Sequence, residues 1–230
     1  MNNNFPYSKY NFNNQDLLSG LTTAECERLT ANKEILNFKA GTQIFKEGTE
    51  PKGIYRVPSG KVKKYTATNF GTDHIFYICG ENEYLGYHAI LSEEEYPDSA
   101  TALLDCEVAF IPKNDFLNVV STSHLLSQRL LKNLSHEFGV FLNATKILAR
   151  YTVRERTAIN LLILQRKFSV KESLKEIEMN RDDLASMVGT AKESLVRMLK
   201  DFKEEKLIST KGRIIFIEDL EGLVKASNYK

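Results

Sequence analysis

The fold of this chain is decided by Asn180-Arg-Asp-Asp-Leu-Ala-Ser-Met-Val-Gly-Thr-Ala-Lys-Glu-Ser-Leu-Val-Arg-Met-Leu-Lys200. Asn180 can cap a helix whose first turn carries two aspartates, which suit the positive end of the helix dipole. Gly189 stands where a residue with positive φ would end this helix. Thr190 and Glu193 form the T-x-x-E pattern of a capping box, which predicts that Thr190 caps a second helix. The stretch therefore predicts two short helices joined by a tight turn.

The apolar residues of this stretch are in register with a helix-turn-helix. Leu184 and Val188 share one face of the first helix, and the small Ala185 allows a second helix to cross closely. Leu195 and Leu199 face inward on the second helix, so that its outer face is free to enter a major groove. An ordinary helical hairpin would show the same pattern, and the segment that follows decides between the two.

A predicted β-hairpin follows the second helix directly. Leu207-Ile208-Ser209 and Arg213–Ile217 are rich in β-branched residues, and Thr210-Lys211-Gly212 joins them. A winged helix needs this order of elements, and a basic wing tip would meet phosphate. The hairpin therefore favours a winged helix. We place this domain at residues 151–230, because Thr152 and Glu155 form a capping box where a new helix begins.

A long helix is predicted before this domain, over residues 121–150. Its apolar positions step by three and four residues, at Leu131, Leu134, Phe138, Phe141, Thr145 and Leu148. This spacing is typical of a coiled-coil seam. The seam could pack on the chain's own β-domain or on a second copy of the chain. Its length and its two phenylalanines favour a dimerisation helix.

Residues 33–112 have the pattern of short β-strands. The runs at 38–41, 43–45, 54–57, 61–65 and 74–78 are rich in β-branched and aromatic residues, with glycines such as Gly71 between them. Turn signals at this spacing predict an antiparallel sandwich or barrel within a domain of residues 15–120. Thr22 or Thr23 can cap a short helix before it. Residues 169–179 are expected to be a polar connection, and the Asn-rich residues 1–14 a flexible arm.

Composition narrows the class of protein. Hydrophobic residues make up 42% of the 230, enough for a folded core. From Ile147 onward there are 17 Lys and Arg against 13 Asp and Glu, whereas the rest has 14 against 17, a distribution that permits DNA binding. The N-terminus lacks the pattern of a signal peptide, and the longest strongly apolar run, Leu161–Leu164, is too short for a membrane span. We expect a cytoplasmic protein with reduced cysteines and no membrane association.

The segment from Arg181 to Ile217 resembles the C-terminal domain of the catabolite-activator and fumarate-nitrate regulator (CRP/FNR) superfamily. The β-region resembles its effector domain at Ala40-Gly41, Phe45–Gly48, Ile54-Tyr55 and Ser59–Val62. The resemblance, over about residues 20–225, implies an α+β chain with an N-terminal jelly roll of the cyclic-nucleotide-binding type, a long dimerisation helix and a C-terminal winged helix-turn-helix. It also implies a bacterial transcription regulator that binds a two-fold symmetric operator as a homodimer, with RNA polymerase and a small effector as further partners.

The resemblance assigns DNA contacts residue by residue. Glu193 and Arg197 match the base-reading positions of the recognition helix, where Arg can reach guanine O6 and N7 and Glu can accept from cytosine N4. Lys192 matches a frequently basic position, whereas Val196 stands where many fumarate-nitrate-type members carry serine. The expected DNA-binding residues are Arg181, Thr190, Lys192, Glu193, Ser194, Arg197, Lys200, Lys211 and Arg213.

The expected effector pocket departs from that of cyclic-AMP-responsive members. Its residues are Leu85, Gly86, Tyr87, His88, Asp98, Ser99 and Ala100. Tyr87 stands where those members carry the Glu that holds ribose, and Asp98 where an Arg pairs with phosphate. Phe141-Leu142 replaces hydroxyls that face adenine. A carboxylate facing a phosphate would repel it. We therefore expect an effector other than cyclic AMP, or a pocket filled by its own side chains.

No cofactor, metal site or catalytic centre is predicted. An iron–sulfur cluster needs about four thiolates, and Cys26, Cys79 and Cys106 are three scattered residues. His74, His88 and Cys79 could ligate haem, but lone histidines are more often surface or core groups. The histidines do not cluster as in a cupin-type enzyme, and no Walker or G-x-S-x-G motif occurs. The alternative to a DNA-binding regulator is a cyclic-nucleotide-domain sensor or interaction module that does not act through DNA. The intact recognition helix and the basic wing argue against that alternative.

Overall fold

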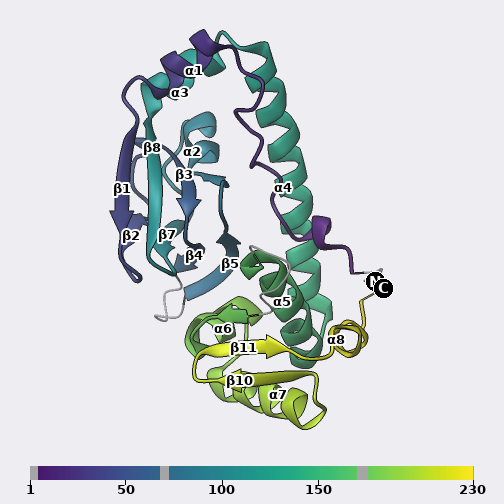
Figure 1. Cartoon of the computed structure of the whole chain (residues 1–230). Helices are drawn as coiled ribbons and strands as arrows, with labels where there is room; N and C mark the ends of the chain where they lie inside the picture. The colour runs from purple at the N-terminus through teal and green to yellow at the C-terminus, as the bar shows by residue number, and fades with distance from the viewer. Residues whose placement is uncertain (1–4, 68–72, 170–175, 230) are drawn as a thin grey trace. The chain divides into compact units, whose positions relative to one another are not determined.

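The structure of the chain is a computed structural model that describes residues 5–67, 73–169 and 176–229. Residues 1–4 of the expected arm, Gly71 and residues 170–175 of the expected polar connection lie outside these ranges. The chain forms two compact units (Figure 1). One consists of Phe12–Gly71 and Tyr77–Gly139, and the other of Met1–Asn11, Thr72–Phe76 and Val140–Lys230. The division falls between Gly139 and Val140, inside the long helix, which itself ends at Arg150 where the sequence places the domain boundary.

The first unit is built on an antiparallel β-roll. One sheet has the order β1-β8-β3-β6, with strands Glu34–Phe38, Cys106–Pro112, Gly53–Ser59 and Tyr84–Leu85. The other has the order β2-β7-β4-β5, with strands Gln43–Phe45, Ser99–Ala102, Val62–Ala67 and Asp73–Cys79. The expected sandwich of short strands is confirmed, and the run 38–41 proves to be the end of β1 and a turn at Gly41, whose φ is +87°.

The strands of the roll bury successive residues, as β7 does with all four of Ser99–Ala102. Val57 on β3 and Val62 on β4 are fully buried, while the residues between them make the turn. Gly60 in that turn has φ +91°, and a Cβ there would lie 2.4 Å from Cβ of Cys106, so only glycine fits. The resulting core is continuous, because Ile54, Ile111 and Phe116 belong to one cluster of buried residues.

Four helices accompany the roll: α1 (Thr23–Thr30), α2 (Tyr87–Ser92), α3 (Lys113–Val120) and α4 (His124–Arg150). Of the two threonines left open by the sequence, Thr22 caps α1, with Glu25 completing a capping box. Leu126 and Leu130 on one face of α4 are buried in the same core as Ile54. The long helix is thus packed against its own roll along one face.

Residues 5–14 differ from the flexible arm that the sequence suggests. After a short 3-10 helix, η1 (Tyr7–Lys9), the chain continues as packed, irregular backbone. Phe5, Tyr10, Phe12 and Asn14 are all buried. The Asn-rich composition concealed this packing because the buried residues are three aromatics and one amide spread among exposed polar residues.

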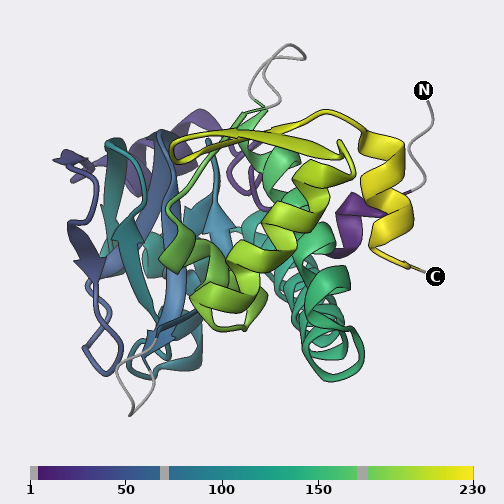
Figure 2. The ribbon, with the colours of Figure 1, turned by 90° about the horizontal axis from the view of Figure 1, so that it is seen from below.

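The second unit contains a winged helix. Its elements are α5 (Val153–Phe168), β9 (Glu176–Glu178), α6 (Arg181–Val188), α7 (Lys192–Glu204), β10 (Ile208–Lys211), β11 (Ile214–Ile217) and α8 (Leu220–Ala226). The expected capping box of Thr152 and Glu155 opens α5. Strand β9 pairs with β11 to complete a sheet of order β10-β11-β9, although the sequence suggested only a polar connection there. Figure 2 shows α7 in light green beside the yellow hairpin of β10 and β11.

In the ranges 5–67, 73–169 and 176–229, no helix combines the length and the hydropathy that crossing a bilayer would take.

Candidate nucleic-acid interface and effector pocket

The helix-turn-helix is formed by α6 and α7, joined at Gly189. Asn180 caps α6, because its side chain accepts from the backbone N–H of Asp183, as expected. Gly189 has φ +69° and ends the helix in the left-handed conformation. A Cβ at this glycine would lie 2.8 Å from Cδ2 of Leu148, so both the turn and the packing require glycine. The turn therefore fixes the angle at which α7 leaves α6.

The expected cap at Thr190 is wrong. The backbone N–H of Thr190 donates to the carbonyl of Ala185 over 3.0 Å, and that of Gly189 donates to Ser186 over 3.2 Å. These two bonds close the C-terminus of α6 in a Schellman-type motif. Thr190 thus belongs to the end of α6, and α7 begins two residues later with Ala191 at its N-cap and no side-chain cap.

The outer face of α7 carries the residues expected to meet bases. Lys192, Glu193, Arg197 and Lys200 are exposed, whereas Ser194 is half-buried. Lys192 forms an ion pair with Asp182 over 2.9 Å, and Lys200 pairs with Glu204 over 3.7 Å. The side chains of Arg197 and Glu193, by contrast, form no hydrogen bond or ion pair with another residue in the described part of the chain. Their full bonding capacity is therefore available to a partner.

Arg181 has a different role from the other expected contacts. Its guanidinium donates to the backbone carbonyls of Gly212 over 3.1 Å, Arg213 over 3.3 Å and Met179 over 3.4 Å. Burial lowers the pKa of this side chain. Arg181 therefore holds the turn of the wing in place from the start of α6. Lys211 and Arg213 at the wing are exposed, and Arg213 lies 3.7 Å from Glu178.

The α4 helix has a second apolar face that is largely exposed in the described chain, although the ring of Phe141 contacts that of Phe76, with centroids 5.5 Å apart. Leu131 is 68% exposed and Phe138 66% exposed, and Phe141, Thr145 and Leu148 are exposed as well. Leu134 is half-buried against the core of the roll. The sequence seam omits Leu142, which is also exposed and lies four residues after Phe138. Two apolar faces on one helix, one buried and one open, are a pattern that a second helix would complete.

The expected effector residues lie together in the roll, and most of them are buried. Leu85, Tyr87, Asp98, Ser99 and Ala100 are each less than 5% exposed, and His88 is half-buried. Gly86 has φ +88° at the start of α2, which aims Tyr87 into the interior. The Ser99 hydroxyl accepts from the backbone N–H of Glu47 over 3.0 Å. The seven residues thus form a packed group of side chains.

Asp98 forms a buried ion pair with Lys64. The Nζ of Lys64 lies 2.9 Å from Oδ2 of Asp98, and both side chains are about 6% exposed. Within the described ranges, no group donates a hydrogen bond to the other oxygen, Oδ1. His88 Nε2 is 3.9 Å from Oδ2. Burial, helped by the Lys64 ammonium, lowers the pKa of His88 to about 3. His88 is therefore neutral near pH 7, and Lys64 alone neutralises Asp98.

Glu137 on α4 faces Tyr87 from the opposite side of the group. The Tyr87 hydroxyl donates a hydrogen bond to Oε1 of Glu137, and the Asn14 carboxamide donates to both residues. Burial is the main cause that raises the pKa of Glu137, and also that of Tyr87. The Tyr87 side chain thus engages a carboxyl group of its own chain.

Sequence reasoning missed Asn14, Lys64 and Glu137. A signal was present for two of them. Lys64 is two residues after the buried Val62 on β4, so both side chains are on the same, inward face of the strand. Glu137 is seven residues after Leu130 and shares its inward face of α4. Asn14 had no such signal, because it lies in irregular backbone.

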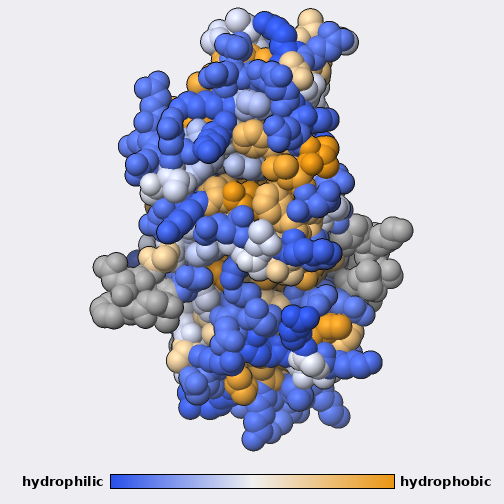
Figure 3. Space-filling view, turned by 90° about the vertical axis from the view of Figure 1, so that its left-hand side faces the viewer, coloured by the Kyte–Doolittle hydropathy of each residue, from blue (hydrophilic) through white to orange (hydrophobic). Residues whose placement is uncertain are grey.

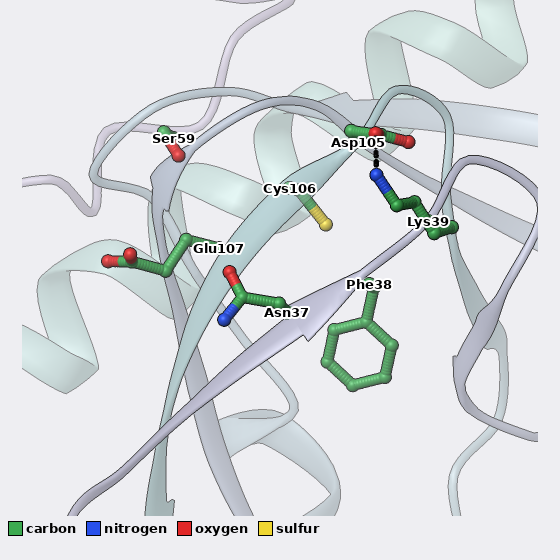
Figure 4. Close-up of a pocket in the computed structure, with 7 residues that line it drawn as sticks. All are labelled: Asn37, Phe38, Lys39, Ser59, Asp105, Cys106 and Glu107. Carbon is green, nitrogen blue, oxygen red and sulfur yellow. Dashed lines mark hydrogen bonds and ion pairs between the residues drawn. The ribbon is translucent and has the colours of Figure 1, made fainter.

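Two hollows lie elsewhere on the roll, and none of the seven expected effector residues lines either of them. One, of about 250 Å³, is lined by Asn37, Phe38, Lys39, Ser59, Asp105, Cys106 and Glu107 (Figure 4). Its Lys39 and Asp105 form an exposed ion pair, and burial raises the pKa of the Cys106 thiol to about 11. The other, of about 300 Å³, has Ile35 and Ile111 among the residues that line it. Figure 3 shows one side of the molecule, where hydrophilic residues surround smaller groups of hydrophobic ones.

The cysteines do not provide the ligands of an iron–sulfur cluster. Such a cluster needs about four thiolates, and the chain has three cysteines. All three are free thiols, with Cys79 and Cys106 buried and Cys26 half-buried. No group of three or more His, Cys, Asp or Glu side chains in the described ranges is arranged to hold a metal ion. The donor set therefore does not fit a cluster held by one subunit.

Comparisons with known proteins agree with this architecture. Residues 35–123 match the family model of the cyclic nucleotide-binding domain, and residues 155–226 that of the Crp-like helix-turn-helix domain. The fumarate and nitrate reduction regulatory protein of Yersinia pestis is 30% identical over 192 residues, which cover 80% of this chain and 75% of that protein. The anaerobic regulatory protein of Haemophilus influenzae is 28% identical over 185 residues, with 79% and 72% covered.

Solved structures show the same fold. FixK2 from Bradyrhizobium japonicum superposes with a TM-score of 0.77 at 19% identity, over 86% of this chain and 98% of that chain. A member of the crp/fnr family from Eubacterium rectale gives a TM-score of 0.77 at 20% identity, over 94% and 100%. The two family models and the sequence relatives go beyond the fold, and they confirm the resemblance drawn from the helix-turn-helix, the wing and the β-region. This chain belongs to the CRP/FNR family of DNA-binding transcription regulators, which are not enzymes.

Proposed function

We propose that the chain acts as a homodimer that reads a two-fold symmetric operator in the cytoplasm of a bacterium. The observation that carries the readout is the outer face of α7, where Arg197 and Glu193 are exposed and have no partner in the described part of the chain. Arg197 would donate two hydrogen bonds to a guanine, and Glu193 would accept one from a cytosine. Lys192, Ser194, Lys200, Thr190, Arg213 and Lys211 would surround these contacts, mainly at phosphates.

The dimer would form through the open face of α4. Leu131 and Phe138 expose about two thirds of their surface, which is costly for large apolar side chains in water. A second copy of the helix would cover Leu131, Leu134, Phe138, Phe141, Thr145 and Leu148, and the same face extends to Leu142. Two-fold symmetry would then present two α7 helices to successive half-sites, and RNA polymerase would be the partner that such a bound dimer engages or blocks.

The group around Asp98 would be the effector site. The Lys64–Asp98 pair places a carboxylate where a nucleotide phosphate would need a cation. The effector would therefore not be cyclic AMP, and neither haem nor an iron–sulfur cluster would be required. The site would comprise Leu85, Gly86, Tyr87, His88, Asp98, Ser99 and Ala100.

Selection of bound sequences from random double-stranded DNA tests the readout. The full chain should enrich an inverted repeat whose half-sites lie about 10 base pairs apart, centre to centre, as two recognition helices related by a two-fold axis require. Light scattering on the selected complex should give two chains per operator. Enrichment of a single asymmetric site bound by one chain would contradict the proposal.

A further inference from the structure

Three residues near the N-terminus, Phe12 to Asn14, reach the effector site of their own chain. Figure 1 shows this purple segment following α4 on its way to α1. Phe12 is 4% exposed and Asn14 is fully buried, whereas Asn13 between them is exposed. The segment therefore inserts two alternate side chains and leaves the middle one in water. We call these residues the N-terminal insert.

Phe12 enters as an aromatic ring stacked on another. Its ring lies parallel to that of Tyr77, with centroids 3.6 Å apart and planes inclined by 16°. The backbone N–H of Phe12 donates to the Tyr77 hydroxyl over 2.9 Å. The Nζ of Lys64 lies 6.0 Å from the centroid of the Phe12 ring, at the limit of a cation–π contact. The ring thus lies beside the same lysine that pairs with Asp98.

Asn14 enters as a carboxamide whose hydrogen bonds are made to residues of the site. Its Nδ2 is 3.1 Å from Oε1 of Glu137, 3.2 Å from the Tyr87 hydroxyl and 3.0 Å from the carbonyl of Tyr84. Its Oδ1 accepts from the backbone N–H of Tyr84 over 3.1 Å. Without Asn14, this part of the site would be a buried space lined by a carboxyl group, a carbonyl and an unbonded N–H.

Such a lining is unusual for a hydrophobic core. A buried polar group without a partner is costly, so cores that need only filling use apolar side chains. Here the filling is the Phe12 ring, which lies beside the lysine that pairs with Asp98, and the hydrogen-bonded Asn14 amide. This is the chemistry with which proteins bind small polar aromatic molecules.

We propose that the effector site takes an aromatic ring together with a neutral carboxamide group, and that Phe12 and Asn14 occupy it as an internal ligand; the inference rests on the effector site proposed above. An external effector carrying both groups would displace the N-terminal insert. A carboxylate in place of the amide would be rejected, because the Asn14 Nδ2 lies 3.1 Å from Oε1 of Glu137 and a carboxylate there would face another carboxyl group.

The insert is covalently joined to residues of the other unit. Phe5 and Tyr10 lie 5.6 and 5.9 Å, centroid to centroid, from the ring of Tyr229, near the C-terminus of the winged-helix unit. Only Asn11 separates Tyr10 from Phe12 in the sequence. Release of the insert would therefore free the chain next to an aromatic cluster of the DNA-binding unit, which gives effector binding a route to regulation.

The test uses the full chain with Phe12→Ala and Asn14→Ala, and a fluorescent peptide of residues 10–17 as the probe. Anisotropy should show saturable binding of the peptide to this opened protein. Binding to the wild type, and to the matched control Asn13→Ala, should be at least tenfold weaker, because their own insert competes at a high effective concentration. Equal binding to all three proteins, or no binding to the opened one, would overturn the proposal.

Altered peptides test the chemistry that we assign to the site. The Asn13→Ala peptide should bind the opened protein as the native peptide does, whereas the Phe12→Ala and Asn14→Asp peptides should bind at least tenfold more weakly. Similar affinities for the Asn14→Asp and native peptides would disprove the preference for a neutral amide. No DNA enters these measurements, so their failure is distinguishable from failure of the operator reading.

A variant of the full chain covers the case in which the doubly substituted protein does not fold. Asn14→Asp keeps the size of the side chain but places a carboxylate beside Glu137. Hydrogen exchange followed by mass spectrometry should then be at least tenfold faster across residues 12–17 and 77–87 than in wild type, and unchanged in Asn13→Ala. Wild-type exchange rates in Asn14→Asp would contradict an insert held through its amide.

Discussion

Lys64 and Asp98 form an ion pair of 2.9 Å inside the roll, with both side chains about 94% removed from solvent. In the proposed effector site, this pair would stand where a cyclic-AMP-responsive domain meets a phosphate. The attraction between the two charges offsets the cost of removing each of them from water. Its rupture should therefore have a large effect on stability.

Asp98→Ala should lower the free energy of unfolding by about 3–5 kcal/mol, because it leaves the Lys64 ammonium buried without its closest carboxylate. The double substitution Lys64→Met with Asp98→Ala should cost clearly less than the sum of the two single changes, Lys64→Met and Asp98→Ala. Urea unfolding of all four proteins gives the coupling energy. The exposed Lys39–Asp105 pair, 2.7 Å long, is the control, and Lys39→Ala should leave the urea midpoint nearly unchanged. Additive effects at Lys64 and Asp98 would show that the pair is not coupled.

Cyclic AMP should not bind the full chain. By the resemblance, Asp98 and Tyr87 stand where cyclic-AMP-responsive members hold phosphate and ribose, and in this chain they bind Lys64 and Glu137 instead. Calorimetry with millimolar cyclic AMP should give no saturable heat, in wild type and in the opened protein with Phe12→Ala and Asn14→Ala. A micromolar dissociation constant in either protein would contradict the interpretation of the pocket.

His88 should make stability depend on pH. Its pKa is about 3 in the folded chain and about 6.5 when unfolded. Between these values the unfolded state binds the proton first, so stability is complete above pH 6.5 and falls as the pH falls. Between pH 7.5 and 5, wild type should lose about 1–2 kcal/mol more than His88→Gln. Urea unfolding at several pH values measures both slopes, and parallel slopes would mean that His88 titrates normally.

Phe138→Asp with Phe141→Asp should give monomers. Two carboxylates on the open face of α4 would repel their counterparts in a second copy and would remain hydrated in the monomer. Multi-angle light scattering should report one chain, and affinity for the selected operator should fall sharply because a monomer covers one half-site. Lys132→Glu, on an exposed part of α4 away from this seam, is the matched control and should remain dimeric. A dimeric double mutant would place the interface elsewhere.

Arg197→Ala and Lys211→Ala should weaken DNA binding in different ways. Loss of the two hydrogen bonds from Arg197 should cost about 1–3 kcal/mol on the selected operator and relax the preference at one base pair per half-site. Loss of the Lys211 phosphate contact should weaken operator and scrambled DNA alike and reduce the slope of log K against log salt by about one. Titrations at matched salt separate the two patterns. If Arg197→Ala lowers both affinities equally, Arg197 contacts phosphate.

The sequence predicted the elements whose causes are local. Asn180, Thr152 and Gly189 each act through backbone groups within four residues, so their pattern alone places the ends of α5 and α6. Thr190 shows where such reasoning stops. Its pattern satisfied a capping box, but its N–H was already committed to the carbonyl of Ala185 at the end of the preceding helix. Two local motifs competed for one residue, and the sequence does not state which prevails.

The effector site could be predicted only in part, because its polar partners come from distant segments. Tyr87 and Asp98 were found by their positions in the resemblance, but Glu137 is 50 residues from Tyr87 and Asn14 is 73 residues from it. Such contacts depend on how irregular backbone is laid over the roll. The same reason explains why residues 5–14 and strand β9 differ from expectation. A polar composition suggests that a segment is exposed to solvent, but it does not show which distant residues the segment will pack against.

The division of α4 at Gly139 has a mechanical consequence. A glycine inside a helix costs about 1 kcal/mol relative to alanine, since it restrains the backbone least. Apart from the adjacent residues and the backbone of α4 itself, no atom of the described residues lies within 4 Å of where its Cβ would be, so no other element packs against this position. The α4 helix is continuous but belongs to two compact units, and the boundary between the units falls next to Gly139, its most flexible residue. We therefore expect α4 to bend mainly at this turn, with the helical segments on either side of it remaining straight.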